Sequence, residues 1–198
     1  DHLASTAGQS PGRHPRARPP SPLHRARGGS GRWPVLRDDG LPPGGRASEE
    51  SPTAPINPYG MSKLMVERIL ADFDRAHGLR HVALRYFNAC GADEEADIGE
   101  RHACETHLIP NILKSLMTDS PLKLQVFGNT YPTPDGTCVR DYVHVTDLVA
   151  AHLLAFEYLA QHQGAFAFNL GYGEGFSVLQ VNDAVEKVTE QKVTYQMA

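Results

Sequence analysis

Segments with the composition of β-strands alternate with amphipathic helical segments from residue 51 to residue 198, and this alternation constrains the fold most. The run His81–Phe87 is short and rich in strand-forming residues, whereas Tyr59–His77 repeats its apolar residues at helical spacing. Alternation of these two patterns along one chain is typical of α/β proteins. We therefore expect an α/β architecture.

The clearest helix is the one expected over Tyr59–His77. Gly78 follows it and supplies the left-handed backbone conformation that commonly ends a helix. Its apolar residues recur every three or four positions and are expected to form a buried stripe. These residues are Leu64, Met65, Ile69, Leu70 and Phe73.

The remaining elements follow the same two patterns. Helices are expected at Leu108–Met117, at Asp147–His162 and from Ser177 to about Thr189. Strands are expected at Leu122–Phe127, Ala165–Leu170 and Val193–Met197, with Cys138–Val145 also extended. Ser177 and Gln180 have the spacing of a capping box, which satisfies two backbone N–H groups at a helix start. In the helix expected at Asp147–His162, the leucines at 148, 154 and 159 are expected to face inward.

Residues 1–50 differ in composition from the rest of the chain. They contain no Ile, Phe, Tyr, Asn, Lys, Met or Cys and are dominated by Arg, Pro, Gly, Ala and Ser, which cannot bury a core. We expect disorder here or, because the absent Ile, Phe, Tyr, Asn and Lys have AT-rich codons, a shifted-frame reading of a GC-rich gene. Residues 51–198 would then be one partial domain. The start at Asp1 and the end at Ala198, inside a strand pattern, lead us to expect a fragment.

Charge and cysteine content narrow the function classes. A formal net charge of -4 argues against nucleic-acid binding, which usually needs a large positive excess. Cys90, Cys104 and Cys138 are odd in number and irregularly spaced, which indicates reduced thiols rather than a disulfide framework. No apolar run approaches the roughly twenty residues that span a bilayer. We expect a cytoplasmic protein that does not enter a membrane.

Tyr59 and Lys63 are the first candidates for chemistry. They stand four residues apart at the start of the expected helix, so their side chains share one face. A neighbouring ammonium group favours the phenolate form of a tyrosine, which makes it a usable base near neutral pH. The spacing alone is also common in helices without any catalytic role. The surrounding sequence has to decide between the two interpretations.

Four segments carry a family resemblance. They are residues 57–63 (NPYGMSK), 84–92 (LRYFNACGA), 105–110 (ETHLIP) and 126–145 (VFGNTYPTPDGTCVRDYVHV). On these segments, residues 51–198 resemble the UDP-glucose 4-epimerases of the extended short-chain dehydrogenase/reductase superfamily. The last segment is the most specific of the four.

The resemblance implies an enzyme that interconverts UDP-glucose and UDP-galactose through a 4-keto intermediate with tightly bound NAD, in galactose metabolism. Tyr59 would remove the proton of the sugar 4-hydroxyl, and Lys63 would hold the cofactor ribose. Tyr86 and Phe87 would meet the nicotinamide. The implied fold is the C-terminal part of a Rossmann-like enzyme with its substrate-binding region, and the intact family member is expected to be a homodimer that uses the helix Tyr59–His77.

The resemblance also implies a binding surface for the UDP-sugar. Asn88 would hydrogen-bond the sugar diphosphate, and Phe127 would pack against the uracil. Arg140 would bind phosphate oxygens through its planar guanidinium, although a structural ion pair with Asp141 is the alternative. The backbone residues expected to border the nucleotide are Thr106, His107 and Leu108.

Two further patterns are assigned no role in chemistry. The histidines at 77, 81, 102 and 107 lack the spacing of a metal site, so no metal is expected. The segment 171–175 (GYGEG) superficially matches a dinucleotide loop, but Phe176 stands where that motif needs its last glycine. We expect this segment to be a turn in the substrate-side region.

The family's N-terminal unit of strand, glycine-rich loop and helix, which binds the cofactor pyrophosphate, has no counterpart in this sequence. Two alternatives therefore stay open. One is a nucleotide-sugar dehydratase or decarboxylase of the same superfamily, which would need further acid–base residues near the tyrosine, where Met61 and Ser62 offer none. The other is a non-catalytic fragment that retains the fold of the substrate region.

Overall fold

The structure is a computed structural model that describes residues 47–95, 97–117 and 124–198. Its helices are α1 (Pro58–His77), α2 (Leu108–Ser115), α3 (Val145–Gln161) and α4 (Val178–Thr189). Its strands are β1 (His81–Tyr86), β2 (Asn88–Cys90), β3 (Leu124–Val126), β4 (Val139–Arg140), β5 (Tyr142–His144), β6 (Ala165–Leu170), β7 (Phe176–Ser177) and β8 (Tyr195–Met197). The expected α/β class is confirmed. Among the described residues, no helix combines the length and apolar character needed to cross a membrane.

The strands of the described residues pair two by two. Parallel pairs join β1 to β6, β2 to β5 and β3 to β8, whereas β4 and β7 run antiparallel. The β1–β6 ladder is the longest and runs from the pair His81 and Ala165 to the pair Tyr86 and Leu170. Mainly parallel pairing is typical of chains whose strands are connected by helices.

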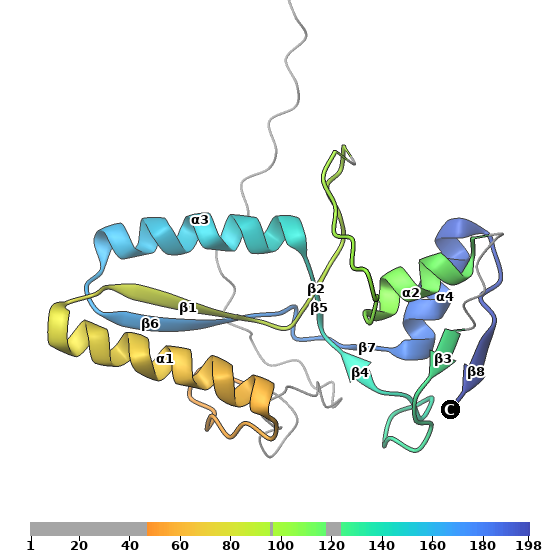
Figure 1. The fold of residues 1–198 in the computed structure, drawn as a ribbon, viewed down its shortest axis with the longest axis horizontal. Helices are drawn as coiled ribbons and strands as arrows, with labels where there is room; N and C mark the ends of the chain where they lie inside the picture. The colour runs from red at the N-terminus through yellow and green to blue at the C-terminus, as the bar shows by residue number, and fades with distance from the viewer. Residues whose placement is uncertain (1–46, 96, 118–123) are drawn as a thin grey trace, which may run out of the picture.

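Two units lie side by side (Figure 1). The first, here named the α1–α3 unit, consists of α1, β1, β6 and α3, with the two strands between the two helices. The second, the α2–α4 unit, consists of α2, α4, β3 and β8. The short strands β2, β4, β5 and β7 lie between the units and are named the junction strands.

Local signals set the ends of α1. The side chain of Asn57 accepts a hydrogen bond from the N–H of Gly60 at 2.7 Å, and Pro58 occupies the first turn, where its missing N–H costs nothing. Gly78 ends the helix at φ 68°, and its N–H bonds to the carbonyl of Asp74 at 2.8 Å. The predicted helix is confirmed within one residue.

The two units bury their apolar residues to different extents. The core of the α2–α4 unit contains Ile112, which is fully buried, with Leu124, Val181 and Val193 at 6–8% exposure. A second cluster joins α3 to the strands and consists of Val143, Leu148, Ala151 and Leu170. Helix α1 contributes no buried residue to either cluster.

The predicted buried stripe of α1 is therefore wrong. Leu64 and Leu70 are only partly buried, and Met65, Ile69 and Phe73 are about half exposed, at 54%, 51% and 49%. The helical spacing was read correctly, but only one edge of the stripe faces β1 and β6. A periodic pattern predicts that a helix has an apolar face, and the fold decides what covers it.

The other predicted elements are confirmed with shifted ends. Strand β6 has the predicted bounds, the capping box at Ser177 and Gln180 is formed, and α3 begins two residues earlier than expected. The extended run Cys138–Val145 divides into β4 and β5, which pair with different partners. Strands β2 and β7 are too short for a periodic signal and were not predicted.

The prediction of disorder or a shifted frame for residues 1–50 falls almost wholly outside the described residues. Within them, residues 49–50 form a turn, and Glu49 accepts a hydrogen bond from the backbone N–H of Asn169 at 2.9 Å. The last few residues of this segment are therefore in contact with β6.

Candidate active site

Tyr59 and Lys63 stand together at the start of α1, as the four-residue spacing predicted. The Lys63 ammonium lies 5.0 Å from the centroid of the Tyr59 ring. Tyr59 is 61% exposed, so its hydroxyl is open to a reactant. A cation at this distance attracts the negative face of the ring. The two side chains are thus in contact at the exposed start of α1.

An ion pair holds this part of α1 against β1. The guanidinium of Arg85 donates two hydrogen bonds to the carboxylate of Glu67, at 2.7 Å and 2.5 Å. Both side chains are mostly buried, at 17% and 26% exposure. Glu67 lies one helical turn after Lys63 on the same face, so the bidentate pair fixes the helix face that carries the reactive residues.

The start of α1 and the ends of β1 and β6 lie toward the same end of the α1–α3 unit (Figure 1). Tyr86 ends β1 with its side chain 51% exposed, and Phe87 follows it, half-buried. In α/β proteins, ligands bind outside the carboxyl ends of parallel strands. The four residues predicted for the cofactor side, Tyr59, Lys63, Tyr86 and Phe87, thus come from elements that meet at this edge.

At Phe87 the chain changes its pairing partner. The N–H of Phe87 bonds to the carbonyl of Leu170 at the end of β6, at 3.3 Å. The next N–H, from Asn88, bonds to the carbonyl of Asp141 at the start of β5, at 3.0 Å. This exchange connects the α1–α3 unit to the junction strands and places Phe87 and Asn88 at the boundary between them.

Asp141 organises the loop opposite Phe87. Its side chain is buried, with the residue 1% exposed, and its two carboxylate oxygens accept the N–H groups of Tyr172 and Gly173 at 3.1 Å and 2.9 Å. Burial raises the pKa of Asp141, and these two N–H groups offset part of that effect. Gly171 packs so tightly here that an added Cβ would lie 2.6 Å from the carboxylate and 2.7 Å from the Phe87 ring.

The same contacts explain why the segment 171–175 is not a dinucleotide loop. A phosphate-binding loop offers backbone N–H groups to the ligand. Here the N–H groups of Tyr172 and Gly173 are used by Asp141. The segment connects β6 to β7 and α4, in agreement with the expected turn.

The predicted diphosphate residues meet at the junction strands. Asn88 donates its side-chain N–H to the carbonyl of Asp141 at 3.0 Å, which leaves its side-chain oxygen and second N–H for a ligand. Arg140 precedes Asp141 and pairs in β4 with Phe176 of β7. Asn88 and Arg140 are therefore connected through Asp141. Asn88 hydrogen-bonds to its carbonyl, and Arg140 precedes it in the chain.

Glu105 shapes the segment predicted to border the nucleotide. One carboxylate oxygen accepts the N–H groups of Thr106 and His107 at 3.0 Å and 2.9 Å, and the His107 ring nitrogen Nδ1 lies 2.7 Å from it. The N–H and ring of His107 and the N–H of Thr106 lower the pKa of Glu105 to about 2. These two N–H groups are therefore bonded within the chain. A nucleotide could contact the N–H of Leu108, the backbone carbonyls and the side chains of the segment.

Phe127 follows β3 and is 70% exposed, so its ring is available to a planar ligand. The loop after it is closed by Asp135, which accepts hydrogen bonds from the N–H and hydroxyl of Thr137, both at 2.8 Å, and from the hydroxyl of Ser177. Although burial raises the pKa of Asp135, these hydrogen bonds lower it overall. The loop is thus tied to the start of α4.

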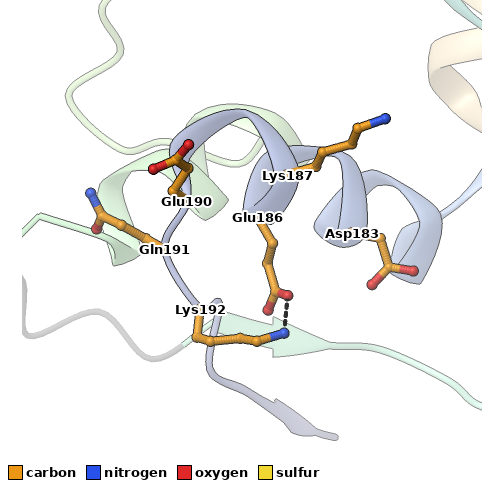
Figure 2. A pocket seen from close by; sticks show the side chains of 6 residues that line it. All are labelled: Asp183, Glu186, Lys187, Glu190, Gln191 and Lys192. Atoms are coloured by element: carbon orange, nitrogen blue, oxygen red, sulfur yellow. Dashed lines mark hydrogen bonds and ion pairs between the residues drawn. The ribbon is translucent and has the colours of Figure 1, made fainter.

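A hollow at the far end of α4 lies apart from these residues. Figure 2 shows it lined by Asp183, Glu186, Lys187, Glu190, Gln191 and Lys192. The ion pair between Glu186 and Lys192, at 2.5 Å, lies across it. All six side chains are polar and the hollow belongs to the α2–α4 unit, whereas Tyr59 and Lys63 start α1, so it is not part of the candidate active site.

The predicted residues form two groups linked by the junction strands. Tyr59, Lys63, Tyr86 and Phe87 belong to the end of the α1–α3 unit, whereas Thr106, His107, Leu108 and Phe127 belong to the α2–α4 unit. The supporting residues Glu67, Glu105, Asp135 and Asp141 were not predicted. Only Glu67 carried a signal, since it continues the four-residue spacing of Tyr59 and Lys63; the others depend on contacts distant in sequence or on short local turns.

Comparisons with known proteins show which proteins this chain resembles. Residues 37–171 match the model of the NAD dependent epimerase/dehydratase family. A UDP-glucose 4-epimerase of Streptococcus mutans serotype c is 51% identical over 159 residues, which are 80% of this chain and 47% of that protein. The chain thus spans about half the length of the curated relatives it matches.

Solved structures give the same picture. The UDP-glucose 4-epimerase of Brucella ovis, in complex with NAD, is 45% identical with a TM-score of 0.72, covering 84% of this chain and 47% of that one. The enzyme of Bifidobacterium longum, in complex with NAD+ and UDP, is 39% identical with a TM-score of 0.76, covering 83% and 50%. The described α/β arrangement therefore matches about half of the length of each of these two enzymes.

Proposed function

Because the chain belongs to the NAD dependent epimerase/dehydratase family, we propose that it is the part of a UDP-glucose 4-epimerase that carries the catalytic helix and the substrate-binding region. The reaction is the interconversion of UDP-glucose and UDP-galactose. The observation that carries the proposal is the exposed Tyr59 with the Lys63 ammonium 5.0 Å from its ring. In fold terms, this is a partial Rossmann-like enzyme without the glycine-rich dinucleotide unit.

The described residues fit one end of NAD. Lys63 would bind the ribose next to the nicotinamide, and Tyr86 and Phe87 would border the nicotinamide ring. The loop 171–175 does not fit the pyrophosphate, because Asp141 already accepts two of its N–H groups. When bound, NAD supplies an acceptor and donor of hydride at the sugar C4.

The chain's own contribution is proton transfer and positioning. The Tyr59 phenolate takes the proton of the sugar 4-hydroxyl as the sugar is oxidised, and Tyr59 returns a proton to that oxygen after the 4-keto sugar has turned over. Lys63 lies beside it, with its ammonium 5.0 Å from the Tyr59 ring. The Glu67–Arg85 pair holds the helix face on which both residues stand.

The substrate side holds the nucleotide. Arg140 binds the diphosphate with its planar guanidinium, and the side-chain amide of Asn88 donates an N–H to the sugar diphosphate. The exposed ring of Phe127 stacks on the uracil, and the residues that border the nucleotide are Thr106, His107 and Leu108. A fixed nucleotide would leave the sugar free to turn, so that C4 can present either face to the bound cofactor.

The dehydratase or decarboxylase alternative has less support. Those reactions need further acid–base groups near the tyrosine. The hydroxyl of Ser62 donates a hydrogen bond to the carbonyl of Tyr59 at 2.7 Å, and Met61 has no titratable group. The non-catalytic alternative is separated from the proposed function by experiment.

The test measures UDP binding, NAD binding and turnover on the 198-residue chain. Calorimetry should show UDP binding that Arg140→Gln weakens by about 10- to 100-fold, as for the loss of a charge-assisted hydrogen bond. The matched control Arg68→Gln, on the exposed side of α1, should bind as the wild type does. Equal UDP affinity in both variants would contradict the assigned diphosphate site.

Turnover from UDP-galactose to UDP-glucose is then assayed with added NAD. Tyr59→Phe should lower turnover by at least about 100-fold, since it removes the proton-transferring group. Tyr195→Phe is the control, because Tyr195 lies on β8 in the other unit. UDP binding without NAD binding or turnover would support the non-catalytic alternative and refute catalysis by this chain alone.

We also propose a homodimer through α1 and a cytoplasmic location. The exposed apolar residues Met65, Ile69 and Phe73 support the first, and the free thiols of Cys90, Cys104 and Cys138 support a reducing compartment. Light scattering should give a dimer that Ile69→Lys converts to a monomer. A wild-type chain that is monomeric at every concentration would refute the α1 interface, and cell fractionation tests the location.

A further inference from the structure

The segment that leads into α2 gathers three side chains able to bind a metal ion. One ligand atom from each of Glu100, His102 and His107 lies within 4.8 Å of the other two. All three side chains are accessible, at 71%, 40% and 58% exposure. Their sequence spacing did not predict a site, because the fold of the segment, rather than a helical repeat, brings His102 and His107 together with their rings 5.2 Å apart.

A buried carboxylate orients one of the two histidines. The Nδ1 atom of His107 lies 2.7 Å from a carboxylate oxygen of Glu105, whose side chain is only 6% exposed. That oxygen also accepts two backbone N–H groups, so it acts as an acceptor, and His107 donates from Nδ1. The lone pair of His107 is then on Nε2. Histidines that bind metals nearly always donate their other N–H to a carboxylate, carbonyl or water in this way.

A hydrogen bond already joins the other two groups, with one proton between them. The Nε2 atom of His102 lies 2.6 Å from a carboxylate oxygen of Glu100. A divalent cation can replace that proton and bind both atoms. Ligand atoms around a tetrahedral zinc ion at about 2.0–2.2 Å stand roughly 3.4 Å apart, so exposed side chains within 4.8 Å need only small rotations to close around it.

The donor set selects the kind of ion. Two imidazole nitrogens and one carboxylate oxygen suit zinc and its neighbours in the transition series, whereas magnesium and calcium prefer oxygen ligands throughout. Glu100 and Glu105 supply two negative charges against the two positive charges of the ion. We propose that Glu100, His102 and His107 form a surface site for a zinc-class divalent cation, with Glu105 as the residue that orients His107. A fourth position stays open to water or an external ligand.

This site shares His107 with the segment proposed to border the nucleotide, but zinc binding to it can be measured without UDP or NAD. It lies before α2 and far along the chain from Tyr59 and Lys63, and its occupation would fix residues 100–107 to the start of that helix. Cys104 is exposed and is not among the three clustered residues, so its thiol could bind zinc separately. The experiment therefore has to separate thiol binding from histidine binding.

The test is a calorimetric titration of zinc chloride into the untagged 198-residue chain and into its Cys104→Ser variant. Both should bind zinc with the same affinity at the clustered residues. In the Cys104→Ser background, His102→Gln or His107→Gln should weaken this binding by more than tenfold, and Glu105→Gln by about tenfold, as expected for loss of an orienting partner. His77→Gln, which changes an exposed histidine at the end of α1, should leave it unchanged.

Cobalt(II) provides a second readout that does not depend on mutation. Cobalt bound to the wild-type chain should show visible d–d absorption without a sulfur-to-cobalt charge-transfer band, because the ligands are nitrogen and oxygen. A sulfur band in the wild type, or zinc affinity retained by the double variant His102→Gln/His107→Gln, would overturn the proposal. Circular dichroism of each variant verifies that the exposed substitutions leave the fold intact.

Discussion

The α2–α4 unit and the α1–α3 unit are built from similar elements but are held together differently. Ile112 in the first is fully buried among apolar neighbours, whereas α1 in the second has no buried residue and keeps Met65, Ile69 and Phe73 about half exposed. The proposed base, Tyr59, stands on the less buried helix. The fully buried Ile112 and the proposed base thus lie in different units, and substitutions can address them separately.

The largest expected effect comes from the core of the α2–α4 unit. Ile112→Ala removes a fully buried side chain that contacts α4 and β3, and we expect a loss of about 3–4 kcal/mol in the free energy of unfolding. Urea denaturation monitored by circular dichroism measures this loss. The corresponding substitution Leu153→Ala, on α3 of the α1–α3 unit where the side chain is 64% exposed, should cost less than about 0.5 kcal/mol. Similar losses in the two variants would mean that the units do not differ in packing.

The second expected effect tests the connection between the units. In Gly171→Ala the new Cβ would lie 2.6 Å from the Asp141 carboxylate and 2.7 Å from the Phe87 ring, so one of them must move. We expect a loss of about 2 kcal/mol from overpacking, measured by the same denaturation. Gly99→Ala is the control, since nothing lies within 4 Å of its added Cβ. If Gly171→Ala left the free energy of unfolding unchanged, Asp141 would not hold the loop rigidly.

The same comparison explains how much the sequence could predict. The long helices and β6 were predicted because their periodic patterns extend over many residues, and the Tyr59–Lys63 pair because both residues belong to one helix. The exposure of Met65 and Phe73 was not, since a pattern does not identify what covers a helix face. The roles of Asp141 and Glu105 depend on backbone N–H groups, which every residue except proline carries, so the sequence does not distinguish the ones that matter.

The third expected effect concerns the ion pair that holds α1. Glu67→Gln removes the charge and one of the two acceptors that Arg85 uses, and we expect a loss of about 1–2 kcal/mol, in the range for hydrogen bonds to charged groups. Hydrogen exchange should increase in α1 more than in α2. Asp72→Asn, which breaks an exposed pair with Arg75, should change stability by less than about 0.5 kcal/mol. Equal losses of stability in the two variants would mean that contacts other than the Glu67–Arg85 pair hold α1 against β1.

The smallest expected effect is a gain in stability, and it concerns the α2–α4 unit. Asn182 on α4 is 3% exposed, and within the part of the chain that the structure describes neither its side-chain oxygen nor its nitrogen has a hydrogen-bond partner. An unpaired buried amide is unfavourable, so Asn182→Leu, of similar size, should stabilise the chain by about 1 kcal/mol.

Asn111→Leu on α2 is the matched control for this gain. The amide of Asn111 donates to the carbonyl of Glu105 at 3.3 Å, so its loss should destabilise the chain by about 1 kcal/mol. Denaturation curves of both variants are measured together. If the hydrogen bonding of the amide decides the result, Asn182→Leu raises the free energy of unfolding and Asn111→Leu lowers it. Destabilisation by both would instead show that the space around Asn182 is too tight for a branched side chain, and that the α2–α4 unit is already packed as closely as its apolar residues allow.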